Sequence, residues 1–201
     1  MEENNAKIGK VIAIIFAILI GIAVIFVMVV KDKEGGGLSS VSNSTNEQVY
    51  DKHSLSFTYP AGFVITTDDY EDGLQDVLCE VKGSDVAQIE ITCVYKEELS
   101  GMPDSEKREM CSGTLNSMED NLRDNYMFRL AKFEPIAKSG YMGKYPCYQR
   151  NFSVSVFSEK SEGVIKMTIT DDGHMLMTVA LYGNDSYKNK IEEIENSIKL
   201  Q

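Results

Sequence analysis

The sequence has no tryptophan, only two histidines, and four prolines and four cysteines among its 201 residues. The histidines, His53 and His174, have no partner at the spacing of a zinc motif, and neither lies near a Ser-x-Gly nucleophile motif. We expect both in surface turns. No two cysteines form a C-x-x-C pair, which excludes the usual redox and zinc motifs. The sequence therefore offers no catalytic constellation; we expect a non-enzymatic protein without a cofactor.

Basic residues are also scarce. Twenty Lys and Arg stand against 31 Asp and Glu, which gives a net charge of -11 at pH 7. The negative electrostatic field of such a protein disfavours the binding of nucleic acid and of anionic lipid headgroups, because both need a basic surface. Nucleic-acid binding is excluded on this ground. The acidity otherwise indicates solubility, and no partner is inferred from it.

Charge is absent altogether from residues 11–30, VIAIIFAILIGIAVIFVMVV. A helix of this length reaches about 30 Å, the thickness of the hydrocarbon core of a bilayer. The segment is longer than the apolar core of a cleaved signal and ends without a small-residue cleavage site, so we expect a permanent transmembrane helix. It also lacks the glutamate of a pilin stem.

The predicted orientation of this helix depends on the sizes of the segments before and after it. Lys7 and Lys10 precede it and Lys31 and Lys33 follow it, so the positive-inside rule gives a tie. A tail of residues 1–10 stays easily in the cytoplasm, whereas a long folded domain is translocated largely regardless of its charge. We therefore predict a single-pass protein of the cell membrane with its amino terminus in the cytoplasm and its domain outside.

Three small residues recur every fourth position in the predicted span: Ala13, Ala17 and Gly21. Such a face lets two helices approach closely, which would make a homodimer. Alanine and glycine are also simply common in membrane helices, so both interpretations stay open.

Residues 31–48 are polar and contain a glycine triplet with many Ser, Asn and Thr. They lack the apolar surface that would offset the entropy of ordering, and we expect a flexible linker. Residues 49–201 then form one domain of ordinary size.

Alternating apolar residues predict several strands in this domain. Short strands flank the turn at residues 60–62, one hairpin turns at the KGSD of residues 82–85, and another turns at Asp172-Gly173. The inward positions of the first hairpin are Val77, Cys79, Val81, Ile89, Ile91, Cys93 and Tyr95. Further apolar runs cover residues 152–156, 164–169 and 175–181.

Two stretches follow a helical period instead. The first, of about 20 residues after Pro103, has the stripe Cys111, Leu115, Met118 and Leu122. The second has Tyr187, Ile191, Ile194 and Ile198, with Asp185 or Ser186 as its N-cap. Together these patterns predict an α+β fold, with an antiparallel sheet flanked by helices.

Two residue groups are candidates for a site. The acids Asp68, Asp69, Glu71 and Asp72 could offer oxygen ligands to Ca²⁺, although adjacent acids usually form a solvated loop. The four cysteines could pair outside the membrane; we prefer Cys79 with Cys93, which flank one hairpin, and Cys111 with Cys147. The alternative is four buried free thiols.

Several motifs together resemble the PsbP-like superfamily. They are FTYPAGF near the start of the domain, SGYMGKYPCY before a long hairpin, the MTVALYG strand and the closing IENSIKL. The resemblance implies an α/β/α sandwich on an antiparallel sheet. Its known members mostly act as accessory or binding proteins attached to larger assemblies. A membrane span departs from the family pattern and argues against a photosynthetic role.

The sequence thus predicts a membrane-tethered accessory or protein-binding module, with another envelope protein as its partner. The alternative is a domain that binds a small ligand or a cation such as Ca²⁺.

Overall fold

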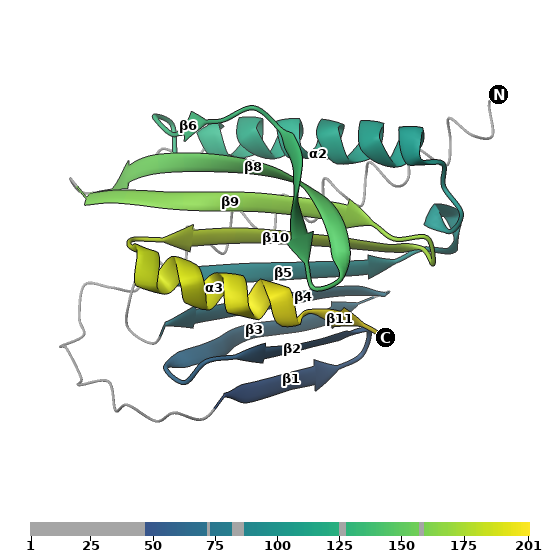
Figure 1. Ribbon diagram of the computed structural model, residues 1–201, viewed down its shortest axis with the longest axis horizontal. Coiled ribbons are helices and arrows are strands. Elements are labelled where there is room, and N and C mark those ends of the chain that lie inside the picture. Colours follow the sequence, from purple (N-terminus) through teal and green to yellow (C-terminus); the bar gives the residue numbers. More distant parts are fainter. Residues whose placement is uncertain (1–46, 72, 82–86, 125–127, 157–158) are drawn as a thin grey trace.

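The computed structural model describes residues 47–71, 73–81, 87–124, 128–156 and 159–201 (Figure 1). The predicted tail, membrane span and most of the predicted linker lie outside these residues. Within the described part of the chain, no helix is both long and apolar enough to cross a membrane.

Most of the domain is one antiparallel sheet of eight strands (Figure 1). Its order is β3-β4-β5-β10-β9-β8-β6, and β7 also pairs with β8. The strands are β3 (Phe63–Glu71), β4 (Leu74–Val81), β5 (Ala87–Tyr95), β6 (Lys132–Phe133), β7 (Ala137–Met142), β8 (Tyr145–Val156), β9 (Glu159–Ile169) and β10 (His174–Tyr182). The predicted pairing of β4 with β5 and of β9 with β10 is confirmed, while the predicted KGSD turn lies outside the described residues. Strands β6 and β7 were not foreseen.

A smaller antiparallel sheet has the order β1-β2-β11. Its strands are β1 (Gln48–Lys52), β2 (Leu55–Tyr59) and β11 (Lys199–Leu200). The sequence pattern missed both edge strands, and Gln48, which we counted in the linker, is the first residue of β1. This sheet joins the start and the end of the domain.

Two α-helices pack on the main sheet: α2 (Asp104–Asp124) and α3 (Asp185–Ser197). All four residues of the predicted α2 stripe are buried, and so are Ile191, Ile194 and Ile198 at α3. The predicted cap of α3 was wrong by one position, because Asn184 accepts the hydrogen bond from the Tyr187 N–H at 3.1 Å. A 3₁₀ turn, η1 (Glu97–Leu99), precedes α2.

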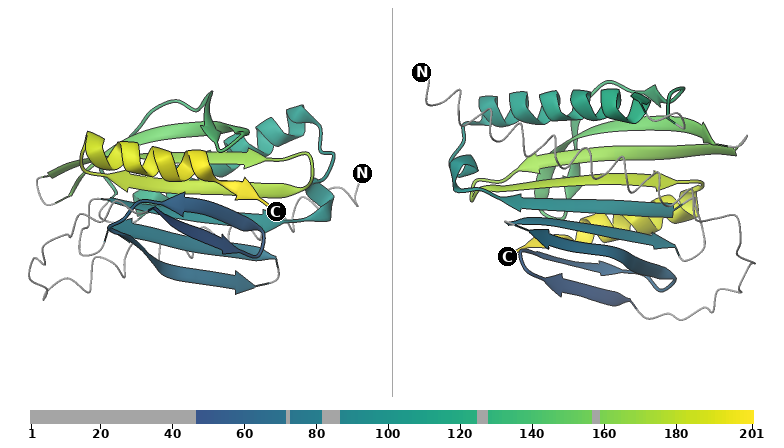
Figure 2. Two further views of the ribbon diagram at one scale, coloured as in Figure 1. Left: turned by 60° about the horizontal axis from the view of Figure 1, so that its bottom comes forward. Right: turned by 180° about the vertical axis from the view of Figure 1, so that it is seen from behind.

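The main sheet has a separate hydrophobic core on each face. On one face α2 contacts β8 and β9, and its stripe packs with residues such as Ile165 and Met167. On the other face α3 and the small sheet pack on residues such as Val164, Ile89 and Ile91 (Figure 2). Successive residues of β9 thus enter opposite cores, as strand alternation requires. The predicted α+β architecture is confirmed for the domain.

The two histidines differ in their surroundings. His53 is exposed in the β1–β2 turn with a φ of 53°, and its ring stacks on Tyr70 with centroids 3.9 Å apart. The expected surface position of His174 was wrong, since this first residue of β10 is 7% exposed. Its Nδ1 lies 3.2 Å from the Asp172 carboxylate, and its ring packs against Tyr95. Tyr95 itself ends β5 in an exposed position.

The turn between β7 and β8 makes a close contact with the end of α3. Gly143 has a φ of 56°, and its N–H donates to the Glu195 carbonyl at 2.7 Å. A Cβ at this position would lie 2.1 Å from the Ile198 carbonyl oxygen. Only glycine fits here without movement of the backbone.

We predict that Gly143→Ala lowers the free energy of unfolding by about 2 to 5 kcal/mol, through the strained φ and the overlap with Ile198. Urea denaturation of the full chain in detergent measures this. Gly113→Ala is the matched control: Gly113 lies within α2 with open space around its Cβ position, so the substitution should stabilise by about 1 kcal/mol. Equal effects of the two substitutions would contradict the prediction.

Candidate functional site

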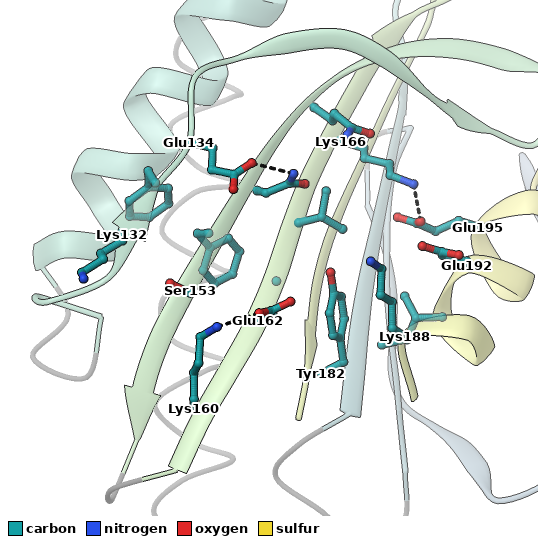
Figure 3. Close-up of a pocket in the computed structure, with 17 residues that line it drawn as sticks. Lys132, Glu134, Ser153, Lys160, Glu162, Lys166, Tyr182, Lys188, Glu192 and Glu195 are labelled. Carbon is teal, nitrogen blue, oxygen red and sulfur yellow. Dashed lines mark hydrogen bonds and ion pairs between the residues drawn. The ribbon is translucent and has the colours of Figure 1, made fainter. Parts of the chain in front are cut away.

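A cleft of about 440 Å³ lies between α3 and the strands β6, β8, β9 and β10 (Figure 3). It is on the α3 face of the main sheet. Its floor comes from the outer strands, and α3 forms one wall with Lys188, Ile191, Glu192 and Glu195. The residues Lys132 to Glu134, at and just after β6, form the opposite rim.

Strand register brings the polar floor together. In the β8–β9 pair, Gln149 lies opposite Lys166, Asn151 opposite Val164, and Ser153 opposite Glu162. Directly opposed residues point to the same face of a sheet. Every second residue from Gln149 to Ser153 therefore presents an amide or hydroxyl group to the cleft.

The charges of the cleft are balanced, with four lysines and four glutamates. Three segments each contribute both signs of charge: the rim with Lys132 and Glu134, β9 with Lys160, Glu162 and Lys166, and α3 with Lys188, Glu192 and Glu195. The site thus has no net charge that would attract a purely anionic or purely cationic ligand.

The Lys166–Glu195 pair closes one end of the cleft. Lys166 Nζ lies 2.5 Å from Glu195 Oε2, and the Thr178 hydroxyl donates to Oε1 at 2.8 Å. The Glu195 side chain is 1% exposed. Burial raises the pKa of Glu195, while Lys166 and the Thr178 hydroxyl act in the opposite direction. The pair therefore joins α3 to both β9 and β10.

The other end of the cleft is open. Lys160 and Glu162 form an ion pair of 2.8 Å with both side chains more than half exposed. The Lys160 ammonium lowers the pKa of Glu162, and Lys188 on α3 adds to this effect across the cleft. Burial raises the pKa of Tyr182 to about 12, with Glu162 as the next cause. At neutral pH Tyr182 is thus an uncharged phenol.

Arg150 holds the rim in place. Its Nε donates to the Glu134 carbonyl at 2.9 Å, and it also reaches Asn116 and Glu119 on α2. Arg123 contacts the same Glu119 carboxylate at 2.8 Å. The guanidinium groups of Arg150 and Arg123 lie 5.5 and 5.0 Å from the ring centroid of Phe133. This network fixes β6 against α2, so the cleft has a rigid rim.

The four acids proposed as a cation site do not come together. Asp68 accepts from Tyr50 at 2.5 Å and pairs with Lys52, which lowers its pKa. Asp69 points to the other face and lies opposite Asp76. Glu71 is exposed, and Asp72 lies outside the described residues. Across the described residues no group of three or more acids, histidines or cysteines is placed to hold a metal ion.

The four cysteines are buried free thiols. Cys79 lies opposite Ile89, four residues along β5 from Cys93. That offset corresponds to about 13 Å, which does not fit the Cα separation of a disulfide. Cys111 belongs to the α2 core and Cys147 to the α3 core. Burial is the main cause that raises the pKa of all four thiols.

Sequence reasoning missed a pair of carboxyl groups on β4 and β5. Asp76 accepts a hydrogen bond from the Thr92 hydroxyl at 2.9 Å, and Glu90 lies beside it with 1% exposure. The hydrogen bond between the two groups raises the pKa of Glu90 and lowers that of Asp76, so Glu90 is its donor, and no described group donates to Glu90. Burial, and then the charge of Asp76, raise the pKa of Glu90 well above its ordinary value. The sequence signal that could have revealed this pair was the position of Glu90 between two isoleucines of β5, which are buried.

We predict that Lys166→Met costs about 3 to 5 kcal/mol of unfolding free energy, because it leaves Glu195 buried without its counter-ion. The double variant Lys166→Met/Glu195→Met should cost clearly less, since no charge is then buried. Urea denaturation of the full-length variants measures both. A double variant that is less stable than the single one would show that the pair is not the unit we describe.

We also predict a pH dependence for Glu90. Its folded pKa is raised, so the folded state binds more protons than the unfolded state at pH values above about 4.5, and stability falls as the pH rises through this window. Glu90→Gln should raise the free energy of unfolding at pH 7 and flatten the pH profile. The exposed α2 residue Glu109 supplies the control, Glu109→Gln, whose profile should follow the wild type. An unchanged profile for Glu90→Gln would contradict the prediction.

No protein-family model matches this chain, and no curated protein matches its sequence. Solved structures do match. A protein of Bacteroides thetaiotaomicron VPI-5482 has a TM-score of 0.45 at 12% identity, over 73% of this chain and 45% of its own. This chain thus spans less than half of that protein. LpqN of Mycobacterium tuberculosis, described as involved in cell envelope biogenesis, has a TM-score of 0.37 at 11% identity, over 78% of this chain and 91% of its own.

The solution structure of cyanobacterial PsbP (CyanoP) from Synechocystis sp. PCC 6803 matches with a TM-score of 0.51. The identity is 12%, and the match covers 83% of this chain and 98% of the other. Almost the whole of that protein is therefore represented here, although few residues are the same. The domain has the PsbP-like fold.

Proposed function

We propose that this protein is a non-catalytic accessory module that binds an extended segment of another protein in the cleft beside α3. The observation that carries the proposal is the charge-balanced polar cleft, whose four lysines and four glutamates come from three segments that each carry both signs of charge. A polypeptide segment carries both signs of charge along with main-chain donors and acceptors, and such a cleft complements it.

The floor of the cleft favours an extended occupant. Gln149, Asn151 and Ser153 recur at every second residue of β8, with a repeat of about 6.7 Å. An extended peptide beside them has the same repeat, so successive groups can meet successive side chains. The rigid rim at β6 and the buried pair at the closed end limit the rearrangement needed on binding, which lowers its entropic cost.

The proposal also includes an anchor of the chain in the membrane. Residues 11–30 would anchor the chain, residues 1–10 would stay in the cytoplasm, and the linker would hold the domain outside, near the membrane surface. The apolar length of the segment and the size of the domain support this topology. The partner would then be another envelope protein, and Ala13, Ala17 and Gly21 leave a homodimer through the anchor as a separate possibility.

Site-specific photo-crosslinking tests the cleft. A benzoylphenylalanine in place of Lys132 on the rim, or of Lys188 on the α3 wall, should give the same adduct in the native membrane, because one segment lies between both walls. The same residue at Arg108, which is exposed on α2, should not give this adduct. The charge reversal Glu162→Lys should weaken the adduct from both wall positions.

Two outcomes would contradict the proposal. One is an adduct that forms equally at Arg108, because contact is then not specific to the cleft. The other is the absence of any adduct at both wall positions in a correctly folded and inserted protein. An adduct with a second copy of the chain would identify the occupant as the protein itself.

A further inference from the structure

A second pocket, of about 460 Å³, lies where the start of α2 meets the β7–β8 hairpin and the end of β9. Figure 1 shows the start of α2 and the end of β9 at the same end of the main sheet. It is separate from the cleft beside α3, and the two share none of their lining residues. Its lining includes two lysines, Lys107 and Lys138, beside Pro146 and Tyr148.

Two lining residues, Lys107 and Asp171, form an ion pair of unequal partners. The Lys107 side chain is 11% exposed, whereas its partner, the Asp171 side chain, is 96% exposed. The ammonium group is therefore fixed in the protein, and the carboxylate reaches it from solvent. A buried charge needs a counter-ion. Among the described contacts, Lys107 is the only group that holds the Asp171 side chain in place.

The backbone of Asp171 is anchored independently of its side chain. Its carbonyl accepts from the Gly101 N–H at 3.0 Å and from the Ser100 hydroxyl at 3.3 Å. The carboxylate can therefore turn away into water without any change in the turn between β9 and β10. Lys107 would then be free to bind another anion at the same position.

The wall beside Lys107 suits a flat apolar body. Pro146 and Tyr148 line the pocket from β8, next to Tyr145, whose own side chain packs with the α3 core and accepts from the Leu200 N–H. The Lys138 ammonium lies 5.7 Å from the ring centroid of Tyr148, so a second cation is close to the same wall. Aromatic rings and a proline stack well on planar groups, and they lose little entropy when they do so.

We propose that this pocket binds a small carboxylate with a single negative charge and a flat apolar body, which replaces Asp171 as the counter-ion of Lys107. The Asp171 carboxylate occupies the place of the ligand carboxylate in the free protein. This site goes beyond the proposed partner cleft and does not depend on it.

The charges around the pocket favour one negative charge over two. Asp104 and Asp172 also line it. The Thr170 hydroxyl is the main cause that lowers the pKa of Asp172, so this carboxylate is ionised at neutral pH. Phosphate, which carries between one and two negative charges at neutral pH, would be repelled by these acids, whereas a carboxylate only exchanges with one that is already there.

Titration of the full-length protein in nanodiscs with benzoate, followed by ligand-observed NMR at constant ionic strength, tests the proposal. Benzamide is the matched neutral probe, and empty nanodiscs are the blank. Benzoate should bind and benzamide should bind more weakly. Lys107→Met should weaken benzoate binding about tenfold, the factor for loss of one charge-assisted hydrogen bond.

Asp171→Asn separates the proposal from a purely structural ion pair. It removes the internal competitor and keeps the shape of the side chain, so benzoate should bind up to about fivefold more tightly, the factor equivalent to a weak ion pair. Lys52→Met is the control, because Lys52 also pairs with an aspartate but lies in β1. It should leave benzoate binding unchanged.

The proposal is overturned if benzoate does not bind, or if Asp171→Asn binds it no more tightly than the wild type. Undiminished binding by Lys107→Met, in a variant that unfolds at the wild-type temperature, would overturn it as well. Inorganic phosphate serves as a last probe: binding as tight as that of benzoate would show that the acids of the pocket do not select a single charge.

Discussion

The buried carboxylate of Glu195 determines where α3 lies on the sheet. A carboxylate with almost no exposure is tolerated only where donors surround it, and here they come from Lys166 on β9 and Thr178 on β10. The carbonyl of the same residue accepts from Gly143 in the β7–β8 turn. One residue thus joins the helix to three other parts of the domain. The wall of the cleft has its position because this requirement is met.

The cleft itself follows from the unequal cover on the two faces of the main sheet. On one face α2 packs over β8 and β9, so the even-numbered residues of β8, such as Phe152 and Val154, enter a core. On the other face α3 packs farther inward, against β10 and β5. The odd-numbered residues of β8 therefore need not be apolar, and Gln149, Asn151 and Ser153 line an open floor.

Local periodicity was enough to predict the two helices and most strands, because each pattern reports one face of one element. The stripe from Cys111 to Leu122 is an example, since all its members are buried. Very short strands escaped prediction: β6 and β11 have two residues each, too few for any period. They form because their neighbours present free hydrogen-bonding edges, which is a property of the assembled sheet.

The sites were harder to predict than the fold, because they depend on pairing between distant segments. Lys166 and Glu195 are 29 residues apart, and each alone is an ordinary surface residue type. The four acids that we considered as a cation site, from Asp68 to Asp72, illustrate the opposite difficulty. They are adjacent in sequence, yet strand alternation sends Asp68 and Asp69 to opposite faces of the sheet. Register, which the sequence does not specify locally, also separates Cys79 from Cys93.

The placement of β1 has a mechanical consequence. The chain enters the domain at Gln48, and β1 pairs with β2 over all five of its residues, from Gln48 opposite Tyr59 to Lys52 opposite Leu55. The other side of β2 pairs with β11 at the carboxyl end of the chain. If the chain is anchored as proposed, tension along the strand axis would load these five residue pairs in shear, all at once. The small sheet would then hold the entering chain to the body of the domain.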